Sequence, residues 1–222
     1  MRSLAWLCAG LLIAAATPAA ARMPAIVQQV TPKAFAYVPA DVPGPAPLIV
    51  LLHGAGGDAR NFLDQFKREA DARGVILLSV QSNGRTWAQH KPKAGEADVA
   101  NIKAAITSLS AKVGIEPGRT TVMGFSDGAS YALSVGMAYP DLFRTIVAFS
   151  PGYAFAPSDL DTDQRIFIAH SRRDPILPAE NTRQMVKGLE SAGFAPEIHW
   201  FNGGHEIDLE LKKAAFDFAL AQ

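Results

Sequence analysis

The chain has 222 residues, of which 49% are hydrophobic and 19% are charged, so it is long and apolar enough to form one globular domain with a sizeable core. Lysine and arginine together number 21, and aspartate and glutamate also number 21. This balance gives no indication of nucleic acid or an anionic surface as a partner of the protein.

The amino-terminal stretch has the pattern of a secretory signal peptide. Arg2 precedes an apolar run from Leu4 to Ala16, and small residues then lead to a typical cleavage site, Ala19-Ala20-Ala21. The run is too short to span a bilayer as a stable helix, although a retained anchor is the alternative. We therefore expect residues 1–21 to be removed and residues 22–222 to form the domain. The protein would then be exported, to a periplasm or out of the cell, without a stable membrane anchor.

Short apolar runs alternate with amphipathic stretches through the rest of the chain. After an extended lead-in over residues 23–32, continuous apolar runs such as Leu48–Leu52 and Val75–Val80 are typical of strands buried on both faces of a sheet. Residues 96–112 instead carry apolar side chains at helical spacing. The predicted strands are 33–38, 48–52, 75–80, 121–125, 144–149, 165–169 and 196–201, and the predicted helices are 59–72, 96–112, 129–139, 178–192 and 206–220.

This alternation predicts βαβ units, and therefore an α/β fold with a mainly parallel sheet and helices on both faces. Ligands of such sheets bind beyond the carboxyl ends of the strands. Residues 150–164, between two predicted strands, are too few to form a lid domain over that edge.

The stretch around Ser126 has the context of a nucleophile elbow. An apolar strand, Thr121–Phe125, ends in Gly124-Phe-Ser-Asp-Gly128, and a predicted helix from Ala129 follows. A side chain at either glycine would crowd the turn, which would present the Ser126 hydroxyl above the sheet. The backbone N–H of Asp127 would lie at a helix N-terminus, where it stabilises developing negative charge. The alternative is a chance match at a plain strand–turn–helix junction, with Asp127 as a favourable first-turn acid.

A serine hydroxyl needs a neighbouring histidine as base, and that histidine needs an orienting carboxylate. In hydrolases with such an elbow, the acid and then the histidine follow the serine along the chain. His205 lies in a glycine-bearing loop between the last predicted strand and the last predicted helix, from which it can reach the serine. The alternative for His205 is a solvent-exposed histidine at a helix start. His199 lies within a strand and His170 ends one, so we interpret the former as structural and the latter as shaping the loop that follows it.

Asp174 is the candidate for the orienting carboxylate. It follows the penultimate predicted strand, so its loop is expected beside the loop of His205 at the edge of the sheet. The alternative is a turn aspartate before Pro175. Other aspartates precede that strand or follow the histidine and are less well placed: Asp159, Asp161, Asp163 and Asp208.

The tetrahedral intermediate of acyl transfer needs two donors to its oxyanion. One is the N–H of Asp127, and we assign the other to the N–H of Ala55, in the loop His53-Gly-Ala-Gly-Gly57. The alternative for this loop is a plain glycine turn that opens a helix. Trp87, in a polar loop after the next strand, is the candidate substrate contact. The sequence has no metal-ligand spacing, and the chemistry requires no cofactor.

Together these motifs make the chain resemble the α/β-hydrolase superfamily over nearly all of residues 22–222. It is most similar to the small phospholipase/carboxylesterase type without a lid, and less similar to feruloyl esterases and polyhydroxyalkanoate depolymerases. The residues that carry the resemblance are Leu52-His-Gly-Ala-Gly-Gly57, Gly124-Phe-Ser-Asp-Gly128, His170-Ser-Arg-Arg-Asp174 with Pro178, and Gly203-Gly-His205. The resemblance implies an α/β-hydrolase fold, with Ser126, Asp174 and His205 as a catalytic triad.

The sequence departs from the carboxylesterase pattern at three positions. Asp127 stands where glutamine is frequent, Ala129 stands where glycine is frequent, and Pro175 directly follows the proposed acid. These departures leave the triad intact and bear on substrate preference.

We therefore expect an exported serine hydrolase that cleaves small or medium carboxylic esters, as small-molecule substrates, through an acyl-enzyme. Two other functions stay open: a serine peptidase or amidase on the same fold, and a non-catalytic binding protein that kept the fold. Comparing p-nitrophenyl esters with the matching anilides tests the first, and labelling by a fluorophosphonate tests the second.

Overall fold

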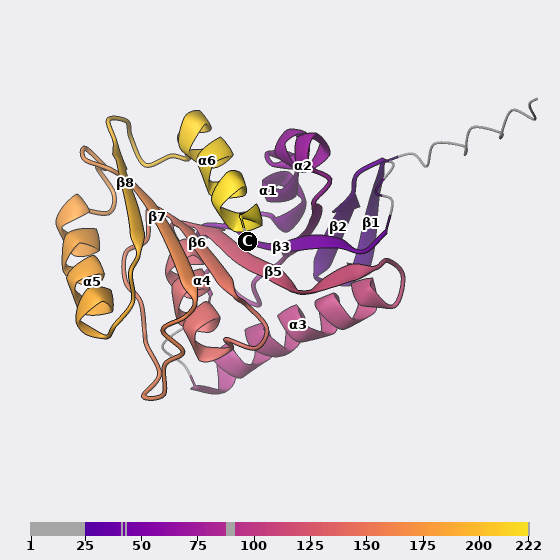
Figure 1. Cartoon of the computed structure of the whole chain (residues 1–222), viewed down its shortest axis with the longest axis horizontal. Coiled ribbons are helices and arrows are strands. Elements are labelled where there is room, and N and C mark those ends of the chain that lie inside the picture. Colours follow the sequence, from indigo (N-terminus) through magenta and orange to yellow (C-terminus); the bar gives the residue numbers. More distant parts are fainter. Residues whose placement is uncertain (1–24, 41, 43, 88–91, 222) are drawn as a thin grey trace, which may run out of the picture.

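The computed structural model of the chain describes residues 25–40, 42, 44–87 and 92–221 (Figure 1). The predicted signal peptide, residues 1–21, lies outside these described residues. The strands are β1 (Ile26–Thr31), β2 (Ala34–Val38), β3 (Ala46–Leu52), β4 (Ile76–Val80), β5 (Ile115–Phe125), β6 (Thr145–Phe149), β7 (Arg165–Ser171) and β8 (Glu197–Phe201). The helices are α1 (Ala59–Asp64), α2 (Lys67–Arg73), α3 (Pro92–Ser110), α4 (Asp127–Ala138), α5 (Ala179–Ser191) and α6 (Leu209–Leu220).

Within the described ranges, eight strands form one sheet in the order β1-β2-β4-β3-β5-β6-β7-β8. The pairings β1–β2 and β2–β4 are antiparallel, and every pairing from β4 across to β8 is parallel. Figure 1 shows α1, α2 and α6 on one side of the sheet and α3 and α4 on the other. This is the α/β-hydrolase fold, so the predicted fold class is confirmed. None of the helices in the described part of the chain is both long and apolar enough to cross a membrane.

Several elements differ from the expected ones, and β5, for example, begins at Ile115 rather than at Thr121. The lead-in predicted over residues 23–32 contains β1, which pairs with β2 through contacts such as Val27 with Tyr37. Its two glutamines give it a weak apolar pattern, which suits an edge strand with only one neighbour. The helix predicted over residues 59–72 is divided into α1 and α2 at Gln65 and Phe66, and Phe66 is fully buried in the core.

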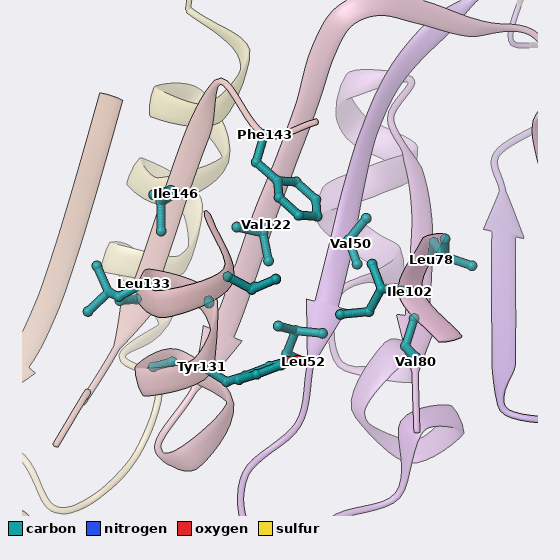
Figure 2. Packing of buried hydrophobic residues seen from close by; sticks show 14 of the residues in the cluster. Val50, Leu52, Leu78, Val80, Ile102, Val122, Tyr131, Leu133, Phe143 and Ile146 are labelled. Carbon is teal, nitrogen blue, oxygen red and sulfur yellow. The ribbon is translucent and has the colours of Figure 1, made fainter. Parts of the chain in front are cut away.

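Two hydrophobic clusters hold helices against the two faces of the sheet. One cluster lies between the sheet and α3, α4 and α5, and Figure 2 shows part of it, with Leu52, Val122 and Tyr131 converging between strands and helices. The other cluster lies on the opposite face and includes Phe66 from the α1–α2 junction and Phe216 from α6. The continuous apolar runs predicted as strands are therefore buried on both faces, as parallel strands require.

The order of the strands brings distant loops together at one edge of the sheet. Although β4 lies between β3 and β5 in the chain, β3 pairs directly with β5, with Leu52 beside Gly124. The loop that follows β3 therefore lies next to the turn that follows β5. Residues 150–164, between β6 and β7, contain neither a helix nor a strand, so no lid domain is inserted there.

Candidate active site

Ser126 occupies a sharp turn between β5 and α4. Its backbone has φ 56° and ψ −119°, a left-handed conformation that is strained for a residue other than glycine. The N–H of Ser126 donates to the carbonyl oxygen of Phe149 at 2.9 Å, which ties the turn to the end of β6. The surrounding structure thus holds the serine in the conformation of a nucleophile elbow.

The two glycines that flank the serine allow very close backbone approaches. A Cβ atom at Gly124 would lie 2.1 Å from the carbonyl oxygen of Gly128. A Cβ atom at Gly128 would lie 2.1 Å from the carbonyl oxygen of Leu52, at the end of β3. The expected crowding at both positions is confirmed, and it explains how α4 starts directly above β3 and β5.

The structure brings Ser126, His205 and Asp174 into one chain of hydrogen bonds. The His205 Nε2 atom lies 2.8 Å from the Ser126 Oγ, and the His205 Nδ1 atom lies 2.6 Å from Asp174 Oδ2. A carboxylate only accepts, so Nδ1 carries the proton in this contact and Nε2 is left to accept the serine hydroxyl. The three predicted side chains come from the loops after β5, β7 and β8 and meet at the carboxyl edge of the sheet.

Asp174 is held by donors on both of its oxygens. Its Oδ1 atom accepts from the backbone N–H groups of Ile176 and Leu177, each at 2.8 Å. Burial by itself would raise the pKa of the Asp174 carboxyl, but the hydrogen bonds from His205, Leu177 and Ile176 outweigh burial and lower it. Asp174 therefore stays a carboxylate, the form that can orient a histidine.

The two other candidate histidines do not contact Ser126. His170 is fully buried under the Asp174 loop, where its Nε2–H donates to the carbonyl oxygen of Leu177 at 2.9 Å. This contact agrees with the prediction that His170 shapes the loop. His199 packs on Phe167, with ring centroids 4.6 Å apart, and agrees with its predicted structural position in a strand.

The two residues predicted as oxyanion donors lie in backbone segments next to the serine. Asp127 is the first residue of α4 and directly follows Ser126. Ala55 lies in a turn closed by the N–H of Gly57, which donates to the carbonyl oxygen of Gly54 at 2.9 Å. A Cβ atom at Gly54 would be 3.4 Å from the Cβ of Ser126, so the backbone of this loop runs against the serine.

Trp87 is not placed to contact substrate, and that prediction is wrong. Its side chain is only 2% exposed and stacks on Tyr131 with ring centroids 5.1 Å apart. Its indole Nε1–H donates to the carbonyl oxygen of His53 at 2.8 Å. A polar sequence context suggested an exposed loop, but the large ring is buried because the hydrogen bond satisfies its polar atom. Tyr131 itself is also buried.

Sequence reasoning missed several polar contacts around the elbow. The hydroxyl of Tyr153 donates to Asp127 Oδ1 at 3.1 Å, and the N–H of Gly152 donates to the Oγ of Ser130 at 2.9 Å. Ser130 lies one helical turn after Ser126, a spacing that marks it as a neighbour of the elbow. Nothing in the sequence indicates that the loop after β6 is its partner. Among the described residues, no group of three or more His, Cys, Asp or Glu side chains is arranged to hold a metal ion.

Known proteins share this fold and this sequence pattern. The sequence matches the phospholipase/carboxylesterase family over residues 36–219. It is 25% identical to the esterase YpfH of Escherichia coli over 186 residues, which cover 77% of this chain and 80% of YpfH.

Solved structures agree with this match at the level of the fold. The structure superimposes on the Bacillus cereus carboxylesterase with a TM-score of 0.67 and 21% identity, covering 84% of this chain and 92% of that one. It also superimposes on the esterase PE8 with a TM-score of 0.65 and 23% identity, covering 82% and 94% of the two chains. With a family match over most of its length and the fold that goes with it, the chain belongs to the phospholipase/carboxylesterase family of α/β-hydrolases.

Proposed function

We propose that this chain is an exported serine esterase that cleaves small or medium carboxylic esters through an acyl-enzyme on Ser126. The observation that carries the proposal is the continuous hydrogen-bond chain from Ser126 through His205 to Asp174, with heavy-atom distances of 2.8 and 2.6 Å. These are the contacts that a general base needs to its nucleophile and to its orienting group.

The proposed reaction starts with proton transfer from the Ser126 hydroxyl to the Nε2 atom of His205. The serine Oγ bonds to the ester carbonyl carbon and forms a tetrahedral intermediate. The intermediate collapses when its bond to the alcohol oxygen breaks, and His205 gives its proton to the departing alcohol. A water molecule then repeats the sequence on the acyl-enzyme and releases the carboxylic acid. Throughout, Asp174 keeps the Nδ1–H tautomer in place and stabilises the imidazolium.

The negative charge on the intermediate requires donors beside Ser126. We assign this role to the backbone N–H groups of Ala55 and Asp127, from the loop after β3 and from the start of α4. The support for this assignment is that the β3 loop runs against the serine and that Asp127 opens a helix, whose N-terminus favours negative charge.

Two features near the site support a carboxylic ester with an apolar group as substrate. The segment between β6 and β7 forms no lid, which favours an open and shallow site. Ile176 is 65% exposed while its N–H is bonded to Asp174, so an apolar side chain is held in solvent directly beside the acid. An apolar acyl or alcohol group would cover that side chain on binding.

The change Ser126→Ala tests the proposed function. It removes the nucleophile, so we expect hydrolysis of p-nitrophenyl acetate and butyrate to fall by a factor of about 10⁴ or more without loss of the folded state. The matched control is Ser108→Ala, which removes a serine hydroxyl that donates to the carbonyl oxygen of Val30, on another part of the fold. A Ser126→Ala protein with full activity would refute the proposal. Faster cleavage of the matching anilides by the unaltered protein would favour an amidase.

Export is part of the proposal and rests on the signal-peptide pattern of residues 1–21. N-terminal sequencing of the protein recovered outside the cytoplasm tests it. A chain that begins at Arg22 supports export, and an intact amino terminus on a cytoplasmic protein contradicts it.

A further inference from the structure

We infer that the segment Arg85–Trp87, together with the carboxylate of Asp127, is a brace that sets the spacing between the two oxyanion donors. The inference rests on the proposed function, since it assigns positioning roles to Asp127 and Trp87 within that same site. Neither side chain takes part in the proposed bond making and bond breaking. Their role is to hold the N–H groups of Ala55 and Asp127 at a fixed separation.

The brace holds the β3 loop on both sides of Ala55. On one side, the Nε1–H of Trp87 donates to the carbonyl oxygen of His53 at 2.8 Å. On the other side, the N–H of Gly56 donates to the carbonyl oxygen of Arg85 at 2.6 Å. Ala55 therefore lies within a short stretch of backbone that is fixed at both ends to the same segment after β4.

The same segment also holds the elbow. The backbone N–H of Trp87 donates to Asp127 Oδ2 at 2.8 Å, while the Tyr153 hydroxyl donates to Oδ1 at 3.1 Å. The two oxygens of one carboxylate thus join the loop after β4 to the loop after β6. The residue whose N–H is the second proposed donor is anchored through its own side chain.

Burial makes the brace rigid. The Trp87 ring stacks on Tyr131 at an interplanar angle of 13° and packs against His53 with centroids 5.2 Å apart. Gly128 lies against the carbonyl groups of Leu52 and His53, so α4 has no space to shift toward β3. A movement of Trp87 would therefore displace both proposed donors together.

Misplaced oxyanion donors would raise the free energy of the transition state. Oxyanion donors act on charge that is present in the tetrahedral intermediate and only weakly in the ester carbonyl. A misplacement of about 1 Å at such a site lowers the rate by about 100-fold. Loosening the brace should therefore lower kcat and weaken the binding of transition-state analogues, with little change in KM.

The chemistry of residue 127 offers a graded test. A carboxylate accepts from both Trp87 and Tyr153. An asparagine can accept from the Trp87 N–H through its Oδ1 and donate to the Tyr153 oxygen through its Nδ2, so Asp127→Asn keeps both contacts. Asp127→Ala removes both. Trp87→Phe keeps an aromatic ring and the backbone N–H but loses the bond to His53.

The experiment measures kcat and KM on p-nitrophenyl butyrate, and the Ki of a trifluoromethyl ketone, which forms a tetrahedral adduct with the serine. We expect Asp127→Ala to lower kcat by about 10- to 100-fold and to raise Ki in parallel, with KM within about threefold. Trp87→Phe should lower kcat by about 10-fold in the same pattern. Asp127→Asn should lower kcat and raise Ki less than Asp127→Ala does, because an asparagine can keep both contacts.

The matched control is Asp161→Ala. Asp161 also accepts two hydrogen bonds, from Arg144 at 2.8 Å and from the N–H of Asp163 at 3.1 Å, but it lies before β7, at the other end of the strands. We expect its kcat and Ki to be unchanged. This control separates a general effect of removing a bonded carboxylate from an effect on the oxyanion site.

Several outcomes would overturn the inference. It fails if folded Asp127→Ala or Trp87→Phe keeps its kcat and Ki, or if the loss appears in KM alone. If Asp127→Ala does not fold, Trp87→Phe is compared with Asp127→Asn instead. The inference fails if Trp87→Phe does not lower kcat and raise Ki more than Asp127→Asn does. An unaltered protein that neither hydrolyses esters nor reacts with a fluorophosphonate would instead refute the proposed function, and the inference with it.

Discussion

The Asp174 carboxylate lies next to two histidines, His205 and His170, and His170 has hydrogen-bond partners of its own. Its Oδ2 atom accepts from His205 and also lies 3.4 Å from the Nε2 atom of His170. The His170 Nε2–H is directed to the carbonyl oxygen of Leu177, and its Nδ1 atom lies 2.7 Å from the hydroxyl oxygen of Thr182. Neutral His170 can make both hydrogen bonds, because its Nε2–H donates to Leu177 while its Nδ1 accepts from the Thr182 hydroxyl.

His170 gives the fold a predictable dependence on pH. Burial lowers its pKa, and this outweighs the opposite effects of the Leu177 carbonyl and the Asp174 carboxylate. Electrostatic interactions with His205 and Arg183 act in the same direction as burial. The unfolded chain, in which a histidine has a pKa of about 6.5, binds this proton more readily than the folded protein. Stability therefore falls as pH drops below about 6.5, until the folded-state pKa is reached.

Replacing His170 by glutamine should remove this part of the pH dependence. We expect His170→Gln to have a lower Tm than the unaltered protein at pH 8, because the fit to Leu177 and Thr182 is poorer. Its Tm should then fall less steeply between pH 7 and pH 5, because the amide does not titrate. Thermal unfolding followed by circular dichroism at several pH values measures both curves. Parallel curves for the two proteins would show that His170 does not contribute.

At the scale of elements, α4 does more than carry the serine at its start. The Ser130 hydroxyl oxygen accepts from the N–H of Gly152 at 2.9 Å, and the Ser134 hydroxyl oxygen accepts from the N–H of Phe155 at 3.0 Å. With the Asp127 carboxylate, these side chains recur at helical spacing and hold the loop after β6 along one face of the helix. The position of α4 on the sheet therefore determines both the elbow and the position of the loop after β6.

Gly128→Ala should disrupt this placement of α4. The added Cβ would meet the backbone oxygens of Leu52 and His53 at 2.1 and 2.5 Å, and both of these residues are buried. We expect the free energy of unfolding to fall by about 3 kcal/mol or more. The matched control is Gly188→Ala in α5, where a Cβ would meet nothing within 4 Å.

Urea denaturation measures both variants. Gly188→Ala should raise the free energy of unfolding by about 0.5–1 kcal/mol, because alanine favours the helix and restricts the unfolded chain. Equal effects of the two substitutions would contradict the close approach of α4 to β3.

At the scale of the whole molecule, one sheet separates two hydrophobic clusters. Phe143 lies in the cluster under α3, α4 and α5, and Phe66 lies in the cluster under α1, α2 and α6. Both side chains are fully buried. Because alternate residues of the same strands supply the two clusters, neither can lose its packing without affecting the sheet that supports the other.

Cavities made on opposite faces should therefore weaken one shared unfolding transition. We expect Phe66→Ala and Phe143→Ala each to lower the free energy of unfolding by about 3–5 kcal/mol. Each variant should keep a single transition when tryptophan fluorescence and circular dichroism are compared. Separate transitions for the two probes would show that the two sides of the sheet unfold independently.

The sequence by itself determined a large part of this protein. Chain order and element ends were enough to select Ser126, Asp174 and His205, because each residue lies in a loop after a predicted strand and the parallel strands end at the same edge. Glycines at 124 and 128 predicted a crowded turn, and the structure has one. These features depend on residues close together in the chain, so hydrophobic periodicity and turn residues predict them.

Only the tertiary structure decided how the loops after β4 and β6 meet the loop after β3 and the elbow. The sheet order places β3 between β4 and β5, and this brings Trp87 back over the β3 loop and onto Asp127. A polar local sequence predicted an exposed Trp87, but burial of its ring and pairing of its N–H groups follow from neighbours distant in the chain. The contact between Tyr153 and Asp127 is of the same kind. Hydrophobic patterning specifies which face of a strand is buried. Strand order, in contrast, depends on the packing of the whole chain. The residues around the serine are positioned by that strand order.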